Sequence, residues 1–452
     1  MSSAPDPLQM AKTHRERLAQ KLGEQAAAVI PAALEQPRNR DVAHPFRQDS
    51  DFHYLTAFPE PDAVAVLVPG RETGSFILFV RERAPEEERW SGSRIGPEGA
   101  CTEYGADQAW PLSEIDQHLP ALLAGRERVV APLGRDERWD QQLLRWLQAA
   151  RRHSRGSARA PAMLELLDHN LHELRLVKDT EELELMRRAA GVSVAAHRRA
   201  MQVAQPGMPE YTLAAELEHV FRRQGGEPAY PSIVAGGANA CVLHYVTQRD
   251  TLQDGDLVLI DAGAELAGYA ADITRTFPVN GHFSAEQRAV YDIVLCAQRA
   301  AIEEVRSGRD FDAFHRRATR ILIEGMVELG WLDGEIDGLL EQGAHRRFFP
   351  HRTGHWLGLD VHDVGNYSLE GKWRTLAPGM VVTVEPGLYC PPDSEGVHPR
   401  WHGIGVRIED DVAVTEDIPW VLTESAPKEP GAIEELMGAV RAAGYEESEA
   451  FD

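Results

Sequence analysis

Two aspartates in residues 257–277 flank a short turn at a spacing that could bring their carboxylates together. The apolar, β-prone runs on either side of Glu265–Gly268 predict a β-hairpin. Asp261 and Asp272 lie at equal distances from the centre of this turn, so antiparallel pairing would place them opposite each other, about 5 Å apart at Cβ. Carboxylates that close repel each other, and burial strengthens the repulsion. The pair therefore needs a shared proton, a cation or a metal ion, unless both aspartates are simply solvated.

Histidines are concentrated further along the chain, in residues 350–365. His351, His355 and His362 fall within twelve residues of a glycine-interrupted segment that is neither clearly helix nor strand. Imidazole is the commonest neutral metal ligand and the usual general acid or base near neutral pH. A lone histidine is more often just hydrogen-bonded in a core, whereas three in one short segment favour a ligand or catalytic role as much as a structural one.

Two glutamates extend the set of candidate ligands. Glu385 ends an apolar strand-like run, immediately before a Pro-Gly pair. An acid that ends a buried strand is costly unless it is paired, although a solvated strand end would explain it equally well. In residues 403–411 the alternation of apolar and polar residues places Arg407 and Glu409 on one face of a strand. This pair could be an ordinary surface salt bridge.

Together, these residues suggest a metal site rather than isolated acids. The candidate ligands are four carboxylates and one imidazole: Asp261, Asp272, His355, Glu385 and Glu409. Hard, oxygen-rich ligation with one nitrogen suits Mn²⁺, Mg²⁺ or Co²⁺ better than a structural zinc site. Several carboxylates that can bridge suit two ions about 3.5–4 Å apart, which would lower the pKa of a shared water.

Other catalytic and binding signatures are missing from the sequence. It contains no HExxH motif, no Gly-x-Ser-x-Gly motif and no GxxxxGK[ST] phosphate loop. The four cysteines are scattered without CxxC spacing, which argues against a thiolate zinc site and predicts a reducing, cytoplasmic setting. A formal net charge of -24 argues against nucleic-acid binding. Because we find no signal-type apolar core and no bilayer-spanning run, we expect no membrane association.

The chain divides by pattern into two domains. Strands that alternate with helices predict an α/β N-terminal domain over residues 1–172. Long helices and antiparallel-type strands predict an α+β domain over residues 173–452. Within the first domain, residues 84–105 are acidic and predict a loop.

Capping signals place the helices of the second domain. Asp179 with Glu182 predicts the start of a first long helix, and Ser284 with Gln287 predicts the start of another. Thr212 is the expected cap of a helix between these two.

Four stretches of this sequence closely resemble the Xaa-Pro aminopeptidases (aminopeptidase P). These stretches are Leu-Ile-Asp-Ala-Gly…Asp-Ile-Thr-Arg-Thr-Phe, Gly-His-Trp-Leu-Gly-Leu-Asp-Val-His-Asp, Val-Glu-Pro-Gly-Leu-Tyr and Arg-Ile-Glu-Asp-Asp. The resemblance covers almost the whole chain, because residues 46–52 also look like the N-domain of the bacterial enzymes. The family belongs to the pita-bread metallopeptidases, with prolidase and methionine aminopeptidase. The resemblance thus implies an α/β N-terminal domain followed by an α+β pita-bread catalytic domain.

The resemblance also implies a role for each candidate residue. The five ligands would hold two Mn²⁺ ions, with Co²⁺, Mg²⁺ or Zn²⁺ as alternatives; Asp272 and Glu409 would bridge, whereas Asp261 and His355 would each bind one ion. Glu385 would also orient the attacking hydroxide and relay its proton. The residues expected to bind substrate or stabilise the tetrahedral intermediate are His244, His351, His362, Tyr389 and Arg407.

The implied activity is release of the N-terminal residue from peptides with a penultimate proline. Prolidase, which cleaves Xaa-Pro dipeptides, and a non-catalytic pita-bread interaction protein are the alternatives. In this family the N-domain helps close the active site of another subunit, usually in a tetramer, with a dimer as the alternative. Trp90 and Arg155 lie where such contributors occur, although Trp90 could be a plain surface or core aromatic. Arg352, which follows His351 where the bacterial pattern has a smaller residue, leaves the preferred peptide length open.

Overall fold

The computed structural model describes residues 5–154 and 159–442, and the chain divides into two compact units. Residues up to Arg175 form the N-terminal unit, and residues from Leu176 onward form the C-terminal unit. The division falls at the end of helix α7 (Leu167–Leu176), three residues beyond the boundary expected after residue 172. Among the described residues, no helix combines the length and apolar character needed to cross a membrane.

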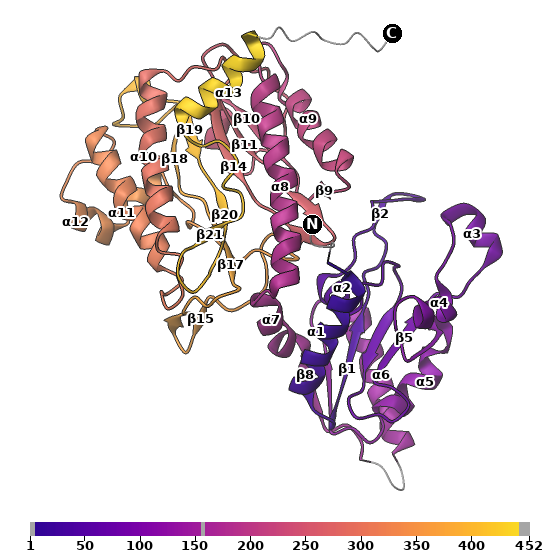
Figure 1. Ribbon diagram of the computed structural model, residues 1–452. Helices are drawn as coiled ribbons and strands as arrows, with labels where there is room; N and C mark the ends of the chain where they lie inside the picture. The colour runs from indigo at the N-terminus through magenta and orange to yellow at the C-terminus, as the bar shows by residue number, and fades with distance from the viewer. Residues whose placement is uncertain (1–4, 155–158, 443–452) are drawn as a thin grey trace. The chain divides into compact units, whose positions relative to one another are not determined.

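The N-terminal unit is built on one mixed sheet that carries helices (Figure 1). Its six strands, in spatial order, are β6 (Gln108–Pro111), β5 (Phe76–Val80), β4 (Val64–Leu67), β1 (Ala26–Pro31), β7 (Arg128–Ala131) and β8 (Met163–Leu166). The central strand β1 pairs antiparallel with β4 and parallel with β7. The alternation of these strands with α5 (Ile115–Leu123) and α6 (Glu137–His153) confirms the predicted α/β class.

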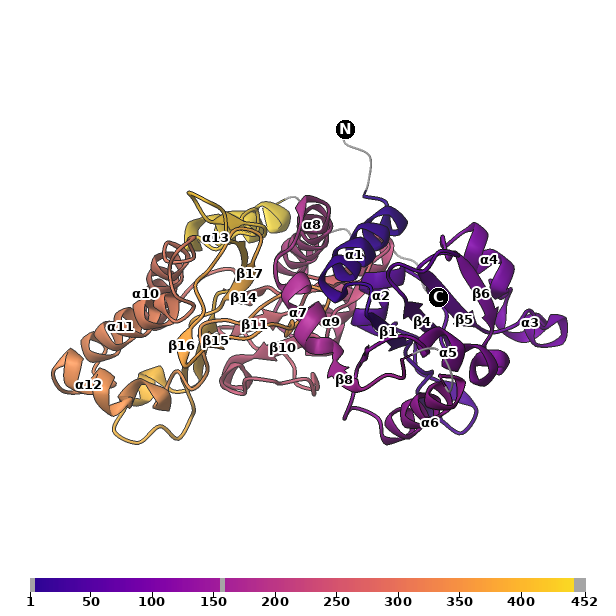
Figure 2. The same ribbon diagram turned by 90° about the horizontal axis from the view of Figure 1, so that it is seen from below.

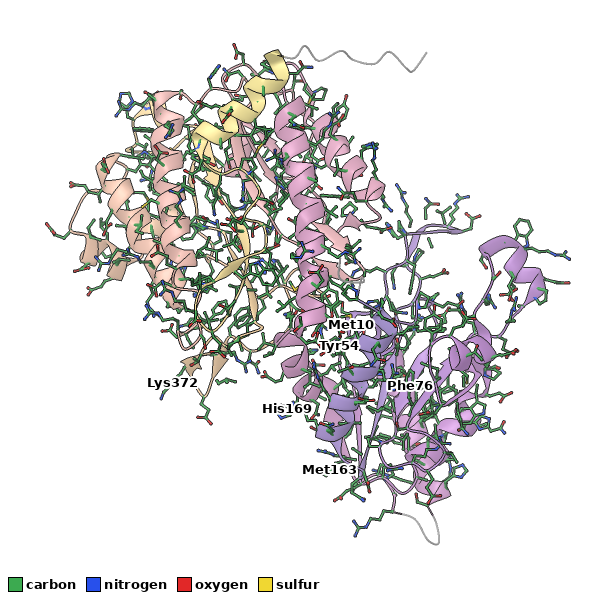
Figure 3. All side chains as sticks on the ribbon, viewed as in Figure 1. Met10, Tyr54, Phe76, Met163, His169 and Lys372 are labelled. Carbon is green, nitrogen blue, oxygen red and sulfur yellow. The ribbon has the colours of Figure 1, made fainter. Side chains whose placement is uncertain are left out.

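Two further helices of this unit pack against each other near its start. Met10 on α1 (Pro7–Leu22) and Tyr54 on α2 (Ser50–Thr56) are buried, and both are labelled in Figure 3. The His14 ring stacks on the Tyr54 ring with 3.7 Å between centroids. A short hairpin of β2 (Pro37–Asn39) and β3 (Val42–Ala43) is exposed.

The loop predicted over residues 84–105 is wrong, because two short helices occupy it. These are α3 (Pro85–Ser91) and α4 (Gly96–Thr102). Each has a proline in its first two positions, where the missing N–H costs nothing. In α3, three glutamates in the first turn also interact favourably with the helix dipole. The acidic composition that suggested a loop is therefore a helix-start signal.

The C-terminal unit combines long helices with small antiparallel sheets, which confirms the predicted α+β class. Its helices are α8 (Thr180–Val203), α9 (Glu210–Arg223), α10 (Ala285–Ile302), α11 (Ala313–Glu328), α12 (Ile336–Gln342) and α13 (Pro430–Ala442). Figures 1 and 2 both show α8 with α9 along one side of the strands and α10 with α11 along the other. The buried faces of these helices and strands form one large apolar core.

The capping predictions for this unit are confirmed at two helices and wrong at a third. Asp179 with Glu182 and Ser284 with Gln287 form complete capping boxes at the starts of α8 and α10. Helix α9 begins at Glu210, after Pro209, so Thr212 lies inside it. Pro209 already supplies the extended backbone at this helix start.

The central hairpin forms as predicted, but its register differs by two residues. Strand β11 (Leu257–Asp261) pairs with β14 (Thr274–Pro278), so Asp261 lies opposite Thr274. The turn is centred on Ala267 and Gly268, whose φ angles of 51° and 86° suit a type I′ turn. This centre lies one residue later than the sequence symmetry suggested. Because a two-residue shift preserves the face, Asp272 still lies on the same side as Asp261.

Candidate active site

A cavity of about 680 Å³ in the C-terminal unit collects nearly all of the predicted site residues. Its walls include all five predicted metal ligands: Asp261, Asp272, His355, Glu385 and Glu409. Four of the predicted substrate-binding residues also line it: His244, His351, His362 and Arg407. The fifth, Tyr389, is buried and reaches the cavity wall through hydrogen bonds with His351 and Arg407.

Trp90, one of the two residues expected to act from a neighbouring subunit, is not among the residues that line this cavity. Trp90 lies on α3 in the N-terminal unit and is 92% exposed. Arg155 lies outside the described residues. The exposure of Trp90 excludes a core role within this unit and leaves a surface or subunit-contact role open.

The ligand candidates lie at strand ends that converge on one point. Asp261 is the last residue of β11, and Glu385 follows β17 (Val381–Val384) directly. Glu409 lies between β19 (Ile404–Arg407) and β20 (Asp410–Ala413). His355 is fixed by its backbone N–H, which donates to Thr383 Oγ1 at 3.1 Å.

Distances between the ligand atoms are compatible with cation binding. His355 Nε2 lies 3.5 Å from Asp272 Oδ2 and 3.6 Å from Glu385 Oε1. Asp272, His355 and Glu409 each offer a donor atom within 4.8 Å of the others. Carboxylate oxygens with one imidazole are a donor set for divalent ions such as Mn²⁺, Co²⁺ or Zn²⁺.

The electrostatics of the protein groups alone favour a cation here. Burial, followed by the neighbouring charges of Asp272, Glu385 and Asp261, raises the pKa of Glu409 well above its ordinary value. Burial likewise raises the pKa of Glu385 to about 7. Burial lowers the pKa of His355, but its hydrogen bond to Asp272 and the charge of Glu385 raise it to about 9. The cluster is therefore deficient in positive charge, and a divalent cation would offset that deficit.

A chain of hydrogen bonds fixes one wall of the cavity. Arg407 Nη2 donates to Asp261 Oδ2 at 2.7 Å, and its Nη1 donates to Tyr389 Oη at 3.0 Å. Tyr389 Oη lies 2.8 Å from His351 Nε2. Arg407 Nε also donates to Thr274 Oγ1, which donates to Glu409 Oε2 at 2.6 Å. Arg407 thus links the outer residues of the site to two of the candidate ligands.

The histidines differ in their surroundings. Burial and then the charge of Arg407 lower the pKa of His351 to about 3, so its imidazole is neutral. The His362 ring lies edge-on to the His355 ring, with 4.3 Å between centroids. Burial and the charge of His355 lower the pKa of His362. His244 is exposed and faces the cavity from the loop before β11.

Tyr230 and Asp411 are among the residues that contact the ligands but were missed in the sequence. Tyr230 Oη lies 2.7 Å from Asp261 Oδ1 and 2.6 Å from Asp272 Oδ1. Buried Asp411 accepts hydrogen bonds from the backbone N–H of Asp272 at 3.2 and 3.3 Å. Tyr230 lies in an irregular segment, so no periodicity marks it, whereas Asp411 was visible only as part of the Glu-Asp-Asp run.

Family comparison agrees with this geometry. Residues 184–416 match the model of metallopeptidase family M24, and residues 11–131 match the aminopeptidase P N-terminal domain. The chain belongs to metallopeptidase family M24. Within it, the resemblance to the Xaa-Pro aminopeptidases is confirmed. An Xaa-Pro aminopeptidase from Escherichia coli is 45% identical over 94% of this chain and 97% of its own length. An Xaa-Pro aminopeptidase from Haemophilus influenzae is 42% identical over 95% of this chain and 97% of its own length.

Solved structures give the same result. An aminopeptidase PepP from Pseudomonas aeruginosa matches with a TM-score of 0.95 and 49% identity, over 97% of this chain and 99% of that one. Aminopeptidase P from E. coli with the inhibitor Pro-Leu matches with a TM-score of 0.93 and 44% identity, over 97% of this chain and 100% of that one. The C-terminal unit is therefore the pita-bread domain that the sequence predicted.

Proposed function

We propose that this chain is a metal-dependent Xaa-Pro aminopeptidase that hydrolyses the peptide bond before a penultimate proline. The observation that carries the proposal is the convergence of four buried or half-buried carboxylates and His355 in one cavity. The chain matches curated Xaa-Pro aminopeptidases over nearly its full length. Because all five ligand types are present, the alternative of a non-catalytic interaction protein is disfavoured.

The five candidate ligands would hold two divalent cations, for which we propose Mn²⁺. Asp272, His355 and Glu409, whose donor atoms lie within 4.8 Å of one another, would hold them together with Asp261 and Glu385. When bound, the ions would lower the pKa of a shared water and polarise the carbonyl of the scissile bond. A zinc-substituted form of E. coli aminopeptidase P, solved with its product, also matches this chain. Elemental analysis of the purified protein would identify the bound ion and would test Mn²⁺ against Zn²⁺.

The residues of the chain itself would orient the reaction. Glu385 lies between the two histidines, with Oε2 3.7 Å from His351 Nδ1 and Oε1 3.6 Å from His355 Nε2. From this position it would accept the proton of the attacking water and transfer it to the leaving proline nitrogen. His362 and His244 face the cavity and would donate hydrogen bonds to the substrate oxygen as negative charge develops on it.

His351, Tyr389 and Arg407 would form the wall that recognises the proline ring. Their mutual hydrogen bonds hold them in place. His351 Nδ1 also lies 2.7 Å from the backbone oxygen of Arg352, so this nitrogen carries the proton and Nε2 accepts from Tyr389. A neutral, fixed imidazole suits contact with an apolar ring.

We further propose a cytoplasmic homo-oligomer, a tetramer or alternatively a dimer. In such an assembly the N-terminal unit of one subunit would help close the active site of another, with Trp90 and Arg155 as contributors. The 92% exposure of Trp90 leaves its ring free for such a contact. Sedimentation analysis, followed by the effect of Trp90→Ala on hydrolysis, would test this assembly.

A comparison of peptide lengths tests the proposed activity. Purified protein with Mn²⁺ should release alanine from the tripeptide Ala-Pro-Ala, and mass spectrometry should find the metal bound. Cleavage of the dipeptide Ala-Pro alone would show that prolidase is the correct activity. The absence of both bound metal and metal-stimulated hydrolysis would refute the metallopeptidase proposal.

A further inference from the structure

One side of the cavity mouth is formed by an arginine stacked on a tryptophan. Arg352 and Trp373 both line the cavity, and they remain 46% and 40% exposed. The guanidinium carbon of Arg352 lies 4.7 Å from the centroid of the Trp373 ring. Such cation–π stacking holds a guanidinium flat and leaves its edge available for hydrogen bonds.

Trp373 belongs to a small hairpin of β15 (Ser368–Leu369) and β16 (Lys372–Trp373). Alternation along β16 turns Trp373 toward the cavity and Lys372 away from it. Figure 3 labels Lys372, whose side chain points away from the ribbon. The positively charged side chain that lines this part of the cavity is therefore Arg352 and not Lys372, the neighbour of Trp373 in β16.

An aromatic cluster holds this rim in place. Phe311 stacks on Trp373 with 6.2 Å between centroids, and it packs on Tyr367 at 4.8 Å and on Trp356 at 4.6 Å. Trp356 directly follows His355, so the cluster runs from the ligand segment to the cavity mouth. Packed aromatic rings have few rotamers and lose little entropy when a ligand binds.

The guanidinium group of Arg352 has more N–H donors than the one hydrogen bond that it forms requires. Among the described residues, Asp312 is the one hydrogen-bond partner of its guanidinium group. Asp312 is shared with Arg316, which also pairs with Asp310. These two arginines and two aspartates balance in formal charge. Binding of an anion would thus depend on the directional N–H groups of Arg352 more than on net positive charge.

The second arginine that lines the cavity, Arg407, already donates hydrogen bonds to other side chains of the site. Arg407 is buried and donates to Asp261, Tyr389 and Thr274. Arg352 follows His351, which the proposed function places against the proline ring. Peptide residues after the proline would therefore leave the cavity past Arg352.

We propose that Arg352, supported by Trp373, is a specificity residue that binds a carboxylate of the peptide downstream of the proline. The carboxylate would be the C-terminus of a tripeptide or the side chain of an acidic residue at that position. This inference rests on the proposed function and deepens it, because it names the class of peptide that the site prefers.

Three matched substrates test the inference in the Mn²⁺-loaded full-length protein. They are Ala-Pro-Ala with a free C-terminus, Ala-Pro-Ala-amide and Ala-Pro-Glu-amide. We expect kcat/KM for the free acid to exceed that for Ala-Pro-Ala-amide by about tenfold, mainly through KM, since a charge-assisted hydrogen bond far from the reacting bond contributes to binding. A similar advantage for Ala-Pro-Glu-amide would show that a side-chain carboxylate is also accepted; its absence would assign the preference to the C-terminus.

Substitutions assign this preference to Arg352. Arg352→Gln should reduce the ratio of kcat/KM for the free acid to kcat/KM for the amide to about one. Arg352→Lys should give a ratio between that value and the wild-type ratio, because lysine keeps the charge but loses the planar fork of hydrogen-bond donors. Arg316→Gln is the matched control, since Arg316 also pairs with Asp312 but does not line the cavity; its ratio should equal that of the wild type. Equal rates for acid and amide in the wild type, or an unchanged ratio in Arg352→Gln, would overturn the inference. If the wild type cleaved none of the three peptides, the proposed function itself would fail.

Discussion

Tyr230 Oη lies 2.7 Å from Asp261 Oδ1, which joins the segment before β10 (Ile233–Gly236) to the end of β11. The same hydroxyl lies 2.6 Å from Asp272 Oδ1. One phenol therefore spans the two aspartates whose repulsion first suggested a metal site. Hydrogen bonds of this kind orient ligand carboxylates before an ion binds, and their loss typically costs roughly 10–100-fold in metal affinity or activity.

Tyr230→Phe should accordingly weaken Mn²⁺ binding by about tenfold. The variant keeps the ring and removes only the hydroxyl, so the fold should persist. Calorimetric titration of the metal-free protein with Mn²⁺ would measure the change, and circular dichroism would verify the fold. Tyr211→Phe, which alters an exposed tyrosine on α9, is the control and should bind as the wild type does. Unchanged affinity in Tyr230→Phe would show that the hydroxyl does not position the ligands.

Asp261→Asn should nearly abolish metal-dependent hydrolysis. The amide keeps the shape of the side chain but removes a negative ligand, and it also removes the carboxylate that Arg407 contacts at 2.7 Å. Because bound ions contribute several kcal/mol to transition-state stabilisation, kcat/KM should fall on the order of a thousandfold. The measurement is Ala-Pro-Ala hydrolysis over a range of Mn²⁺ concentrations. Asp333→Asn, at an exposed position on the same unit, should retain full activity. Near-normal turnover in Asp261→Asn would refute its role as a ligand.

The sequence predicted the ligands better than their surroundings. Asp261, Glu385 and Glu409 each end or follow an apolar strand, and this local pattern is readable without a structure. The register of the hairpin was harder to predict from the sequence. Its turn could be centred on either of two adjacent positions, and a one-residue change in centre moves the pairing by two residues. Only the positive φ angles of Ala267 and Gly268 decide between them.

Tyr230 and Asp411 were missed for a different reason. Their contacts with Asp261 and Asp272 join segments far apart in the chain, and tertiary packing brings them together. No period or motif in one sequence encodes such a distance. The aromatic cluster around Phe311 is unpredictable in the same way, because it draws on three separate segments.

Gly263→Ala should distort the hairpin that carries Asp261. A Cβ at this position would lie 1.7 Å from the backbone oxygen of Ala271, and backbone cannot move aside cheaply. We expect a loss of about 3 kcal/mol in the free energy of unfolding, together with weaker metal binding. Urea denaturation and Mn²⁺ titration would measure the two effects.

Gly191→Ala provides the matched control for this substitution. Gly191 lies within helix α8, where a Cβ meets nothing within 4 Å. Alanine is favoured over glycine in a helix by up to about 1 kcal/mol, so this variant should be as stable as the wild type or more so. A Gly263→Ala protein with wild-type stability and metal affinity would show that the two strands can separate without cost.

Asp51 forms a buried ion pair in the N-terminal unit whose contribution to stability depends on pH. Arg175 Nη1 donates to Asp51 Oδ1 at 2.6 Å, and Arg135 and His172 lie near the other oxygen at 3.3 and 3.4 Å. Burial alone would raise the pKa of Asp51, but its hydrogen bonds with His172 and Arg175 hold it well below the ordinary value. Because the folded protein has the lower pKa, the stabilisation is complete above the unfolded pKa, near 4, and is lost as the pH falls below it.

Asp51→Asn should therefore destabilise the protein by about 3 kcal/mol at pH 7, since it leaves the buried Arg175 guanidinium without its carboxylate. The deficit relative to wild type should shrink as the pH falls from 4 toward 3, where the unfolded wild-type chain takes up a proton that the folded state resists. Urea denaturation of both proteins at pH 7, 4 and 3 gives the free energies of unfolding. Asp333→Asn, applied to an exposed carboxylate, should show no deficit at any of these pH values. A deficit for Asp51→Asn that stayed constant from pH 7 to 3 would mean that it comes from lost packing and not from the charge of Asp51.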